Sequence, residues 1–169
     1  MKLVTTADEI IEAVRDASLV VVDTETKSLR PHADGKILAG LGVKPFNDEG
    51  FYISFRHQDS KNARLSELKR VCEALRGKTL VGHNVNFDQA VILQEGIDLS
   101  NERWVNIKVL ARLTYEDLPN YELERLAGGI LGIIDAGVAK TALRAYRAKL
   151  ARARGVKIDD ISYDMIPAE

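Results

Sequence analysis

Val20-Val21-Val22-Asp23-Thr24-Glu25-Thr26 is the most informative stretch of this chain, because three β-branched residues lead directly into two carboxylates spaced i, i+2. Alternate side chains of a strand point to the same side, so Asp23 and Glu25 are predicted to project together from one face at a strand end. Two such anions repel each other unless a cation lies between them, and their hard oxygen ligands suit Mg²⁺ or Mn²⁺. The alternative is an ordinary solvated strand end followed by a turn.

A second informative stretch covers residues 80–88, with the sequence LVGHNVNFD. A short apolar run passes through a glycine into a predicted helix, for which Asn84 is the expected N-cap. Asn84 and Asp88 are four residues apart and would share one helical face. Alone, the pattern also fits an ordinary capped helix with an exposed Asp. Together the two stretches place the carboxylates of Asp23, Glu25 and Asp88 at the ends of two separate elements, which is how a metal site is assembled.

These two stretches resemble a known family of nucleases. Residues 23–29 (DTETKSL) and 82–88 (GHNVNFD) are similar to the first two motifs of the 3′-5′ exonucleases with four catalytic acidic residues, the DEDD or DnaQ-like group. The resemblance is closest to the proofreading domain of bacterial and phage family A DNA polymerases, of the DNA polymerase I type. It extends through residues 109–113 and 117–127 to ISYDMIP at 161–167. It implies an α/β, ribonuclease H-like fold in which a mixed sheet is flanked by helices.

The resemblance also implies roles for individual residues. Asp23, Glu25 and Asp88 would be the catalytic residues and would ligate two divalent cations, Mg²⁺ or Mn²⁺. Asn84 would help to place the substrate, and Leu29 would be an apolar wedge against the terminal base. The alternative for Leu29 is a residue packed under the following turn.

The third motif of the family has no counterpart in this sequence. That motif is a Tyr or His shortly before the fourth metal-binding Asp, on a closing helix. None of the five tyrosines here is part of a Tyr-x-x-x-Asp pattern. We therefore expect one exonuclease domain over residues 1–169 that is truncated or split before the third-motif helix. Three acids could instead act as a makeshift fourth ligand, although their spacing favours none of them: Asp159, Asp160 and Asp164.

Positive charge is concentrated near the end of the chain, where residues 138–158 contain seven basic residues and no acid. On a helix, basic and apolar side chains of this segment fall on different faces. One interpretation is contact with a DNA backbone, with Arg144 and Arg147 as the candidate ligands. The alternative is a solvated amphipathic helix.

Composition agrees with one globular domain of 169 residues, 46% hydrophobic and 29% charged, with a net charge of −1. This charge excludes a general nucleic-acid coat, but it allows a nuclease whose metal ions meet the phosphate. The single cysteine, Cys72, excludes an internal disulfide and is predicted to be buried in a helix. Neither a signal peptide nor an apolar run of membrane-spanning length is present, so we expect a cytoplasmic protein of a bacterial or phage-infected cell.

The pattern of apolar residues and turn signals predicts alternating strands and helices. A capping box at Thr6 and Glu9 is predicted to open a helix that ends at Val14. Strands are expected at about 19–23, 37–43, 51–55, 80–81 and 104–107. Helices are expected at about 65–75, 84–94, 109–115, 121–131 and 138–154.

Two classes of function follow from these features. The first is a metal-dependent exonuclease that hydrolyses the 3′-terminal phosphodiester of single-stranded DNA, as the proofreading part of a phage-like DNA polymerase. Its partner would be a polymerase domain or subunit that supplies the missing carboxylate. The second is a catalytically incomplete remnant or interaction module that binds metal and DNA. A ribonuclease D-like RNA exonuclease is a weaker alternative.

Overall fold

The computed structural model describes residues 1–58 and 60–168. They form two compact units, Met1–Val105 with Ser162–Glu169 and Asn106–Ile161, and each is described by itself. Whether they act as one exonuclease domain that lacks its last helix remains a prediction.

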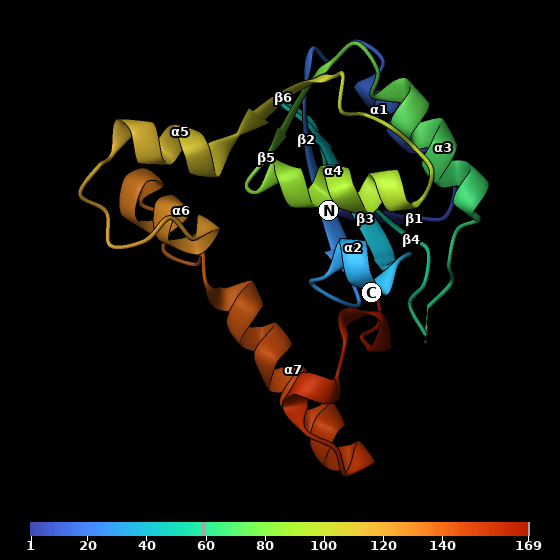
Figure 1. Ribbon diagram of the computed structural model, residues 1–169, viewed down its shortest axis with the longest axis vertical. Coiled ribbons are helices and arrows are strands. Elements are labelled where there is room, and N and C mark those ends of the chain that lie inside the picture. Colours follow the sequence, from blue (N-terminus) through green and yellow to red (C-terminus); the bar gives the residue numbers. More distant parts are fainter. Residues whose placement is uncertain (59, 169) are drawn as a thin grey trace. The chain divides into compact units, whose positions relative to one another are not determined.

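A six-stranded mixed sheet forms the centre of the first unit (Figure 1). Its strand order is β1-β4-β3-β2-β5-β6, with β1 at Lys2–Val4, β2 at Leu19–Thr26, β3 at Leu38–Pro45, β4 at Phe51–Ser54, β5 at Thr79–Gly82 and β6 at Arg103–Asn106. The inner strand β2 pairs antiparallel with β3 and parallel with β5. Strand β4 pairs antiparallel with β3 and parallel with β1.

The helices of this unit are α1 (Asp8–Val14), α2 (Pro31–Asp34), α3 (Leu65–Ala74) and α4 (Val85–Gln94), and η2 (Tyr163–Met165) is a short 3₁₀ turn. Helices α1 and α3 lie side by side, whereas α4 packs against β2 and β5 (Figure 1). The core that these elements share is aliphatic, and its largest fully buried side chains include Ile10, Leu38, Leu41, Ile53, Leu68, Leu80 and Ile92. Cys72 is buried in α3, as predicted.

The N-terminus of α1 is capped by a distant residue. The expected capping box at Thr6 and Glu9 is wrong, because the N-cap residue is Ala7 and its side chain makes no cap hydrogen bond. Instead the amide of Ala7 donates to Oε2 of Glu67 in α3, at 2.8 Å. A carboxylate at a helix N-terminus also interacts favourably with the helix dipole, so Glu67 caps α1 and joins it to α3.

A buried ion pair anchors the C-terminal end of α4. The guanidinium of Arg56 donates two hydrogen bonds to Glu95, at 2.7 and 2.8 Å, and a third to the carbonyl of Leu38, at 2.8 Å. The side chain of Glu95 is only 2% exposed. The bidentate geometry fixes both distance and orientation, so α4 is held against the segment that follows β4 and, through Arg56, against the first residue of β3.

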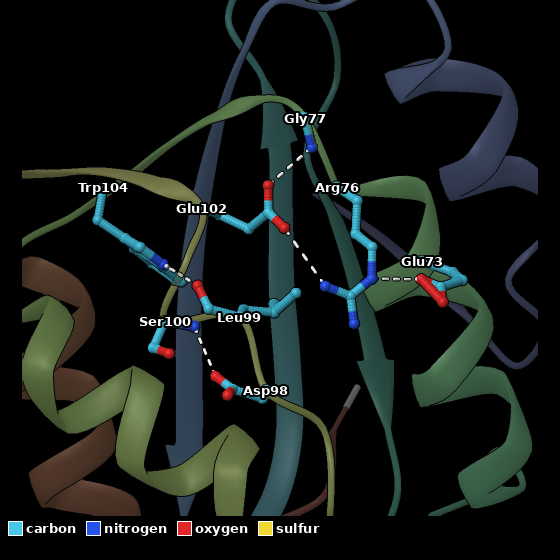
Figure 2. Close-up of polar contacts among 8 residues, drawn as sticks. All are labelled: Glu73, Arg76, Gly77, Asp98, Leu99, Ser100, Glu102 and Trp104. Atoms are coloured by element: carbon cyan, nitrogen blue, oxygen red, sulfur yellow. Dashed lines mark hydrogen bonds and ion pairs between the residues drawn. The ribbon is translucent and has the colours of Figure 1, made fainter.

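The loop that leads into β6 is held by polar contacts with the end of α3 (Figure 2). Glu102 accepts a hydrogen bond from the amide of Gly77 at 2.8 Å and one from Arg76 at 3.3 Å. The indole of Trp104 donates to the carbonyl of Leu99 at 2.9 Å. These contacts place β6 beside the start of β5.

The second unit contains α5 (Ile107–Thr114), α6 (Leu123–Leu131), α7 (Val138–Arg154) and the 3₁₀ turn η1 (Ile158–Asp160). Asn106 caps α5, because its side-chain oxygen accepts from the amides of Lys108 and Val109. Helices α6 and α7 end at Gly132 and Gly155, both with a φ of 66°, which is the left-handed conformation that glycine adopts easily.

The helices and strands predicted from the sequence have counterparts in the structure, with shifted ends. Strand β2 continues to Thr26 rather than ending at Asp23, and β3 continues to Pro45. The sequence patterns missed β1 and α2, which have three and four residues and are too short to show a period. Within residues 1–58 and 60–168, no helix is both long and apolar enough to span a bilayer.

Candidate active site

Two of the three candidate carboxylates lie on one face of the inner strand β2. Asp23 and Glu25 alternate with Val22, Thr24 and Thr26, which are all buried. The alternation follows from the two-residue period of a strand. The hydrophobic side of β2 therefore holds the strand in the sheet, while the acidic side carries the two carboxylates that the sequence predicted to project together.

The third carboxylate reaches β2 from the first turn of α4. Asp88 is 4% exposed, so the alternative of an exposed Asp is wrong. Its Oδ1 accepts a hydrogen bond from the Thr24 amide at 3.0 Å and another from the Thr24 hydroxyl at 2.7 Å. Asp88 is therefore fixed on the residue that lies between Asp23 and Glu25.

A glycine allows this close approach of helix and strand. A Cβ at Gly82 would lie 3.0 Å from Cγ1 of Val85, 3.2 Å from the carbonyl oxygen of Val22 and 3.7 Å from Oδ2 of Asp88. A side chain at this position would push the start of α4 away from β2. The motif glycine thus serves the packing that brings Asp88 to the site.

The three carboxylates repel one another. Burial is the main cause that raises the pKa of Glu25 to about 7, and the charges of Asp23 and Asp88 raise it further. Burial raises the pKa of Asp88 to about 6, with a contribution from Asp23, although the hydrogen bonds from Thr24 oppose the shift. Burial also raises the pKa of Asp23, while His83 lowers it. Each carboxylate therefore lies within the electric field of another.

The chemistry of these donors fits a divalent cation, because hard oxygen ligands that repel one another are stabilised by a positive charge between them. Among residues 1–58 and 60–168, however, no three His, Cys, Asp or Glu side chains are gathered closely enough to hold a metal ion as they stand. The assignment of Asp23, Glu25 and Asp88 as metal ligands therefore remains a proposal.

The two residues expected to contact substrate near these acids are both exposed. Asn84 occupies the N-cap position of α4, as the sequence predicted, although its side chain makes no cap hydrogen bond. Leu29 is 79% exposed in the loop after β2, so the alternative of a residue packed under the turn is wrong. Contact of Leu29 with a terminal base stays a prediction.

The basic candidates lie in the second unit. Arg144 is exposed on α7. Arg147 donates from Nε to the carbonyl of Ile161 at 2.9 Å and from Nη2 to the carbonyl of Ile158 at 3.1 Å. Arg147 therefore holds the segment after α7, and Arg144 is the better candidate for a phosphate ligand. A role for either arginine at DNA stays a prediction.

Two of the acids considered as a makeshift fourth ligand are engaged by neighbouring residues. Oδ2 of Asp160 accepts from the amide of Lys157 at 3.0 Å. Asp164 accepts from the hydroxyl of Ser162 and from the side chain of Gln58. The contacts with Lys157 and Ser162 stabilise local turns, whereas the contact with Gln58 joins two segments far apart in the sequence.

Sequence reasoning missed Tyr52 and His57, which lie near the acidic face. Burial and the charges of Glu25 and Asp23 raise the pKa of the Tyr52 hydroxyl. The hydroxyl lies 2.7 Å from Nε2 of His57. The available signal was the pair of glycines at positions 40 and 42, which leaves two successive positions on one face of β3 without side chains.

Comparison with known proteins gives two results at the level of family and sequence. A family model described as 3′-5′ exonuclease matches residues 3–151. No curated protein matches the chain.

Several solved structures share the fold. NrnC of Brucella melitensis, solved with bound Mg²⁺, has a TM-score of 0.56 at 21% identity, and the match covers 78% of this chain and 60% of NrnC. RNase D of Escherichia coli, an exoribonuclease involved in structured RNA processing, has a TM-score of 0.56 at 18% identity. The match covers 78% of this chain and 33% of RNase D. The Nibbler EXO domain of Aedes aegypti has a TM-score of 0.55 at 12% identity, and the match covers 78% of this chain and 68% of the Nibbler chain. The likeness and the mixed sheet confirm the fold class expected from the sequence.

Proposed function

Because the chain belongs to the 3′-5′ exonuclease family, we propose that it removes the 3′-terminal nucleotide of single-stranded DNA, as the proofreading part of a phage-like DNA polymerase. The observation that carries this proposal is the approach of Asp88 to the acidic face of β2, where burial and neighbouring carboxylates raise the pKa values of Glu25 and Asp88. A cluster of carboxylates with raised pKa values costs free energy unless it binds cations, and this cost supports a functional role for the cluster.

In this proposal Asp23, Glu25 and Asp88 hold two divalent cations, Mg²⁺ or Mn²⁺. When bound, such cations lower the pKa of a water molecule and stabilise the charge that develops on the phosphate. Thr24 keeps Asp88 ionised and fixed, since hydrogen bonds to a carboxylate favour its charged form. The exposed side chains of Asn84 and Leu29 orient the terminal nucleotide.

The missing third motif leads to a proposal about the partner. A polymerase domain or subunit, in the same chain or a separate one, would supply the fourth carboxylate beside the acidic face. We propose the cytoplasm of a bacterial or phage-infected cell as the place where it acts.

A nuclease assay tests this function. The chain is incubated with 3′-labelled single-stranded DNA and Mn²⁺, beside Asp23→Ala and the surface control Glu12→Gln, in which an exposed carboxylate that pairs with the exposed Arg15 is removed. Release of mononucleotides that requires Mn²⁺, is lost in Asp23→Ala and is kept in Glu12→Gln supports the proposal. Equal release by wild type and Asp23→Ala contradicts it.

Two other candidates are outcomes of the same assay. Mn²⁺-dependent DNA binding without release identifies the catalytically incomplete remnant, which the lack of a third-motif Tyr and Asp in the sequence favours. Faster release from RNA than from DNA of the same sequence identifies a ribonuclease D-like enzyme, which the likeness to RNase D and NrnC favours.

A further inference from the structure

The register of three adjacent strands places Tyr52 on the same face of the sheet as the acids. Gly42 of β3 lies opposite Asp23 of β2 on one side and opposite Tyr52 of β4 on the other. Two residues earlier in β3, Gly40 lies opposite Glu25 of β2. Residues directly opposite in antiparallel strands project to the same face, so the two glycines leave open space between Tyr52 and the carboxylates.

The Tyr52 ring leans into that space toward Glu25. A Cβ at Gly40 would lie 2.0 Å from the Tyr52 hydroxyl oxygen and 2.3 Å from Cζ, so the hydroxyl occupies the place of a side chain at Gly40. Cβ atoms of directly opposite residues are about 5 Å apart. The Tyr52 hydroxyl therefore lies within reach of the Glu25 carboxylate, directly or through one water molecule.

A histidine fixes the direction of the Tyr52 proton. Nδ1 of His57 lies 2.6 Å from the carbonyl oxygen of Ile166, and Nε2 lies 2.7 Å from the Tyr52 hydroxyl. A carbonyl oxygen can only accept, so Nδ1 carries the single proton of the neutral imidazole and Nε2 is an acceptor. The Tyr52 hydroxyl therefore donates to His57 and has only acceptor capacity left.

The histidine is itself held firmly. His57 is 7% exposed, and its ring meets the Tyr52 ring edge-on, with centroids 5.9 Å apart. The Asn62 side chain accepts from the His57 amide at 2.9 Å and donates to the His57 carbonyl at 2.6 Å. The position of the Tyr52 oxygen is thus determined by a continuous chain of contacts within the first unit.

The Tyr52 oxygen and the Glu25 carboxylate consequently face each other across Gly40, and both are acceptors when a bound cation keeps Glu25 ionised. A water molecule has two protons and can donate one to each acceptor. We propose that Tyr52 is a positioning residue of the exonuclease site, which holds a water molecule jointly with Glu25 and so orients the Glu25 carboxylate. This inference rests on the proposed function, in which Glu25 binds a divalent cation.

Metal affinity tests the inference without any need for catalysis. Mn²⁺ binding is measured by electron paramagnetic resonance for wild type, Tyr52→Phe, Asp23→Ala and the control Tyr146→Phe, which removes a hydroxyl from the exposed side of α7. Residues that orient metal ligands typically change metal affinity about 10–100-fold when removed, so we expect a loss of about tenfold or more in Tyr52→Phe. Tyr146→Phe is expected to bind Mn²⁺ as wild type does.

The outcomes separate this inference from the proposed function. If wild type binds Mn²⁺ and Asp23→Ala does not, but a folded Tyr52→Phe binds within twofold of wild type, the role of Tyr52 is overturned and the proposed function stands. If Asp23→Ala binds as tightly as wild type, both are overturned.

His57→Asn provides a second variant, because it keeps the Tyr52 hydroxyl but removes the imidazole that holds this hydroxyl in place. Should Tyr52→Phe fail to fold, weakened binding by folded His57→Asn supports the inference, and unchanged binding overturns it.

Discussion

Asp88 and Thr24 are joined by two hydrogen bonds to one carboxylate oxygen, from the Thr24 amide at 3.0 Å and from the Thr24 hydroxyl at 2.7 Å. The first bond comes from the backbone of β2 and needs no particular side chain. The second depends on a threonine between the two acids of the strand. Thr24 therefore links the acids of β2 to the acid of α4.

Thr24→Val should weaken metal binding while it preserves the shape of the side chain. The substitution removes the hydroxyl that favours the ionised form of Asp88, so the pKa of Asp88 should rise above about 6. A hydrogen bond to a charged group contributes about 1.5–3 kcal/mol, so Mn²⁺ affinity at pH 6.5 should fall about 10- to 100-fold. Titration calorimetry measures this, with Thr141→Val on α7 as the control. A larger effect in the control than in Thr24→Val would contradict the prediction.

Glu25 should make the metal-free protein less stable as the pH rises. Its pKa in the folded protein is about 7, above the ordinary 4.5, so the folded state binds more protons than the unfolded state between these values. Stability therefore decreases as pH increases from about 4.5 to about 7, and the difference corresponds to at most about 3 kcal/mol.

Urea unfolding in the presence of EDTA checks this prediction for Glu25. Glu25→Gln cannot ionise, so relative to wild type it should gain stability at pH 8 and little at pH 5. A stability difference between the two proteins that does not change with pH would show that Glu25 has an ordinary pKa.

Arg56→Leu should destabilise the protein strongly. The substitution leaves the carboxylate of Glu95 without its partner while its side chain is 2% exposed, and removing one member of a buried pair costs about 3–5 kcal/mol. Arg15→Leu is the matched control, since Arg15 and Glu12 form an exposed pair worth at most about 1 kcal/mol. Urea unfolding at pH 7 gives both values, and equal losses would contradict the prediction.

Gly82→Ala and Gly129→Ala should have opposite effects on stability. At Gly82 the added Cβ would meet the Val22 carbonyl oxygen at 3.2 Å, and overpacking of this kind costs about 1–3 kcal/mol. At Gly129, inside α6, the Cβ would have no neighbour within 4 Å, so the better helix propensity of alanine should add about 0.5–1 kcal/mol. Thermal unfolding followed by circular dichroism distinguishes the two. A stabilising Gly82→Ala would show that α4 can move away from β2 without cost.

Local sequence was a good guide where a pattern repeats over neighbouring residues. The two-residue period of residues 20–26 predicted that Asp23 and Glu25 share a face, and the structure has them alternate with buried side chains. The same local reasoning was less reliable at helix ends. It placed the cap of α1 at Thr6, whereas the N-cap residue is Ala7, and it placed the cap of α4 correctly at Asn84, whose side chain makes no cap hydrogen bond.

The resemblance of two short motifs was enough to indicate the exonuclease family. The residues also indicated a mixed sheet and three acids on two elements, because strand alternation and helix spacing depend on near neighbours in the chain. The contacts that complete the site come from residues far apart in sequence. Glu67 caps α1 from 60 positions away, Thr24 binds Asp88 from 64 away, and His57 binds the Ile166 carbonyl from 109 away. Such contacts depend on strand register and helix packing, which form only when the whole chain buries its apolar surface, so no local pattern could predict them.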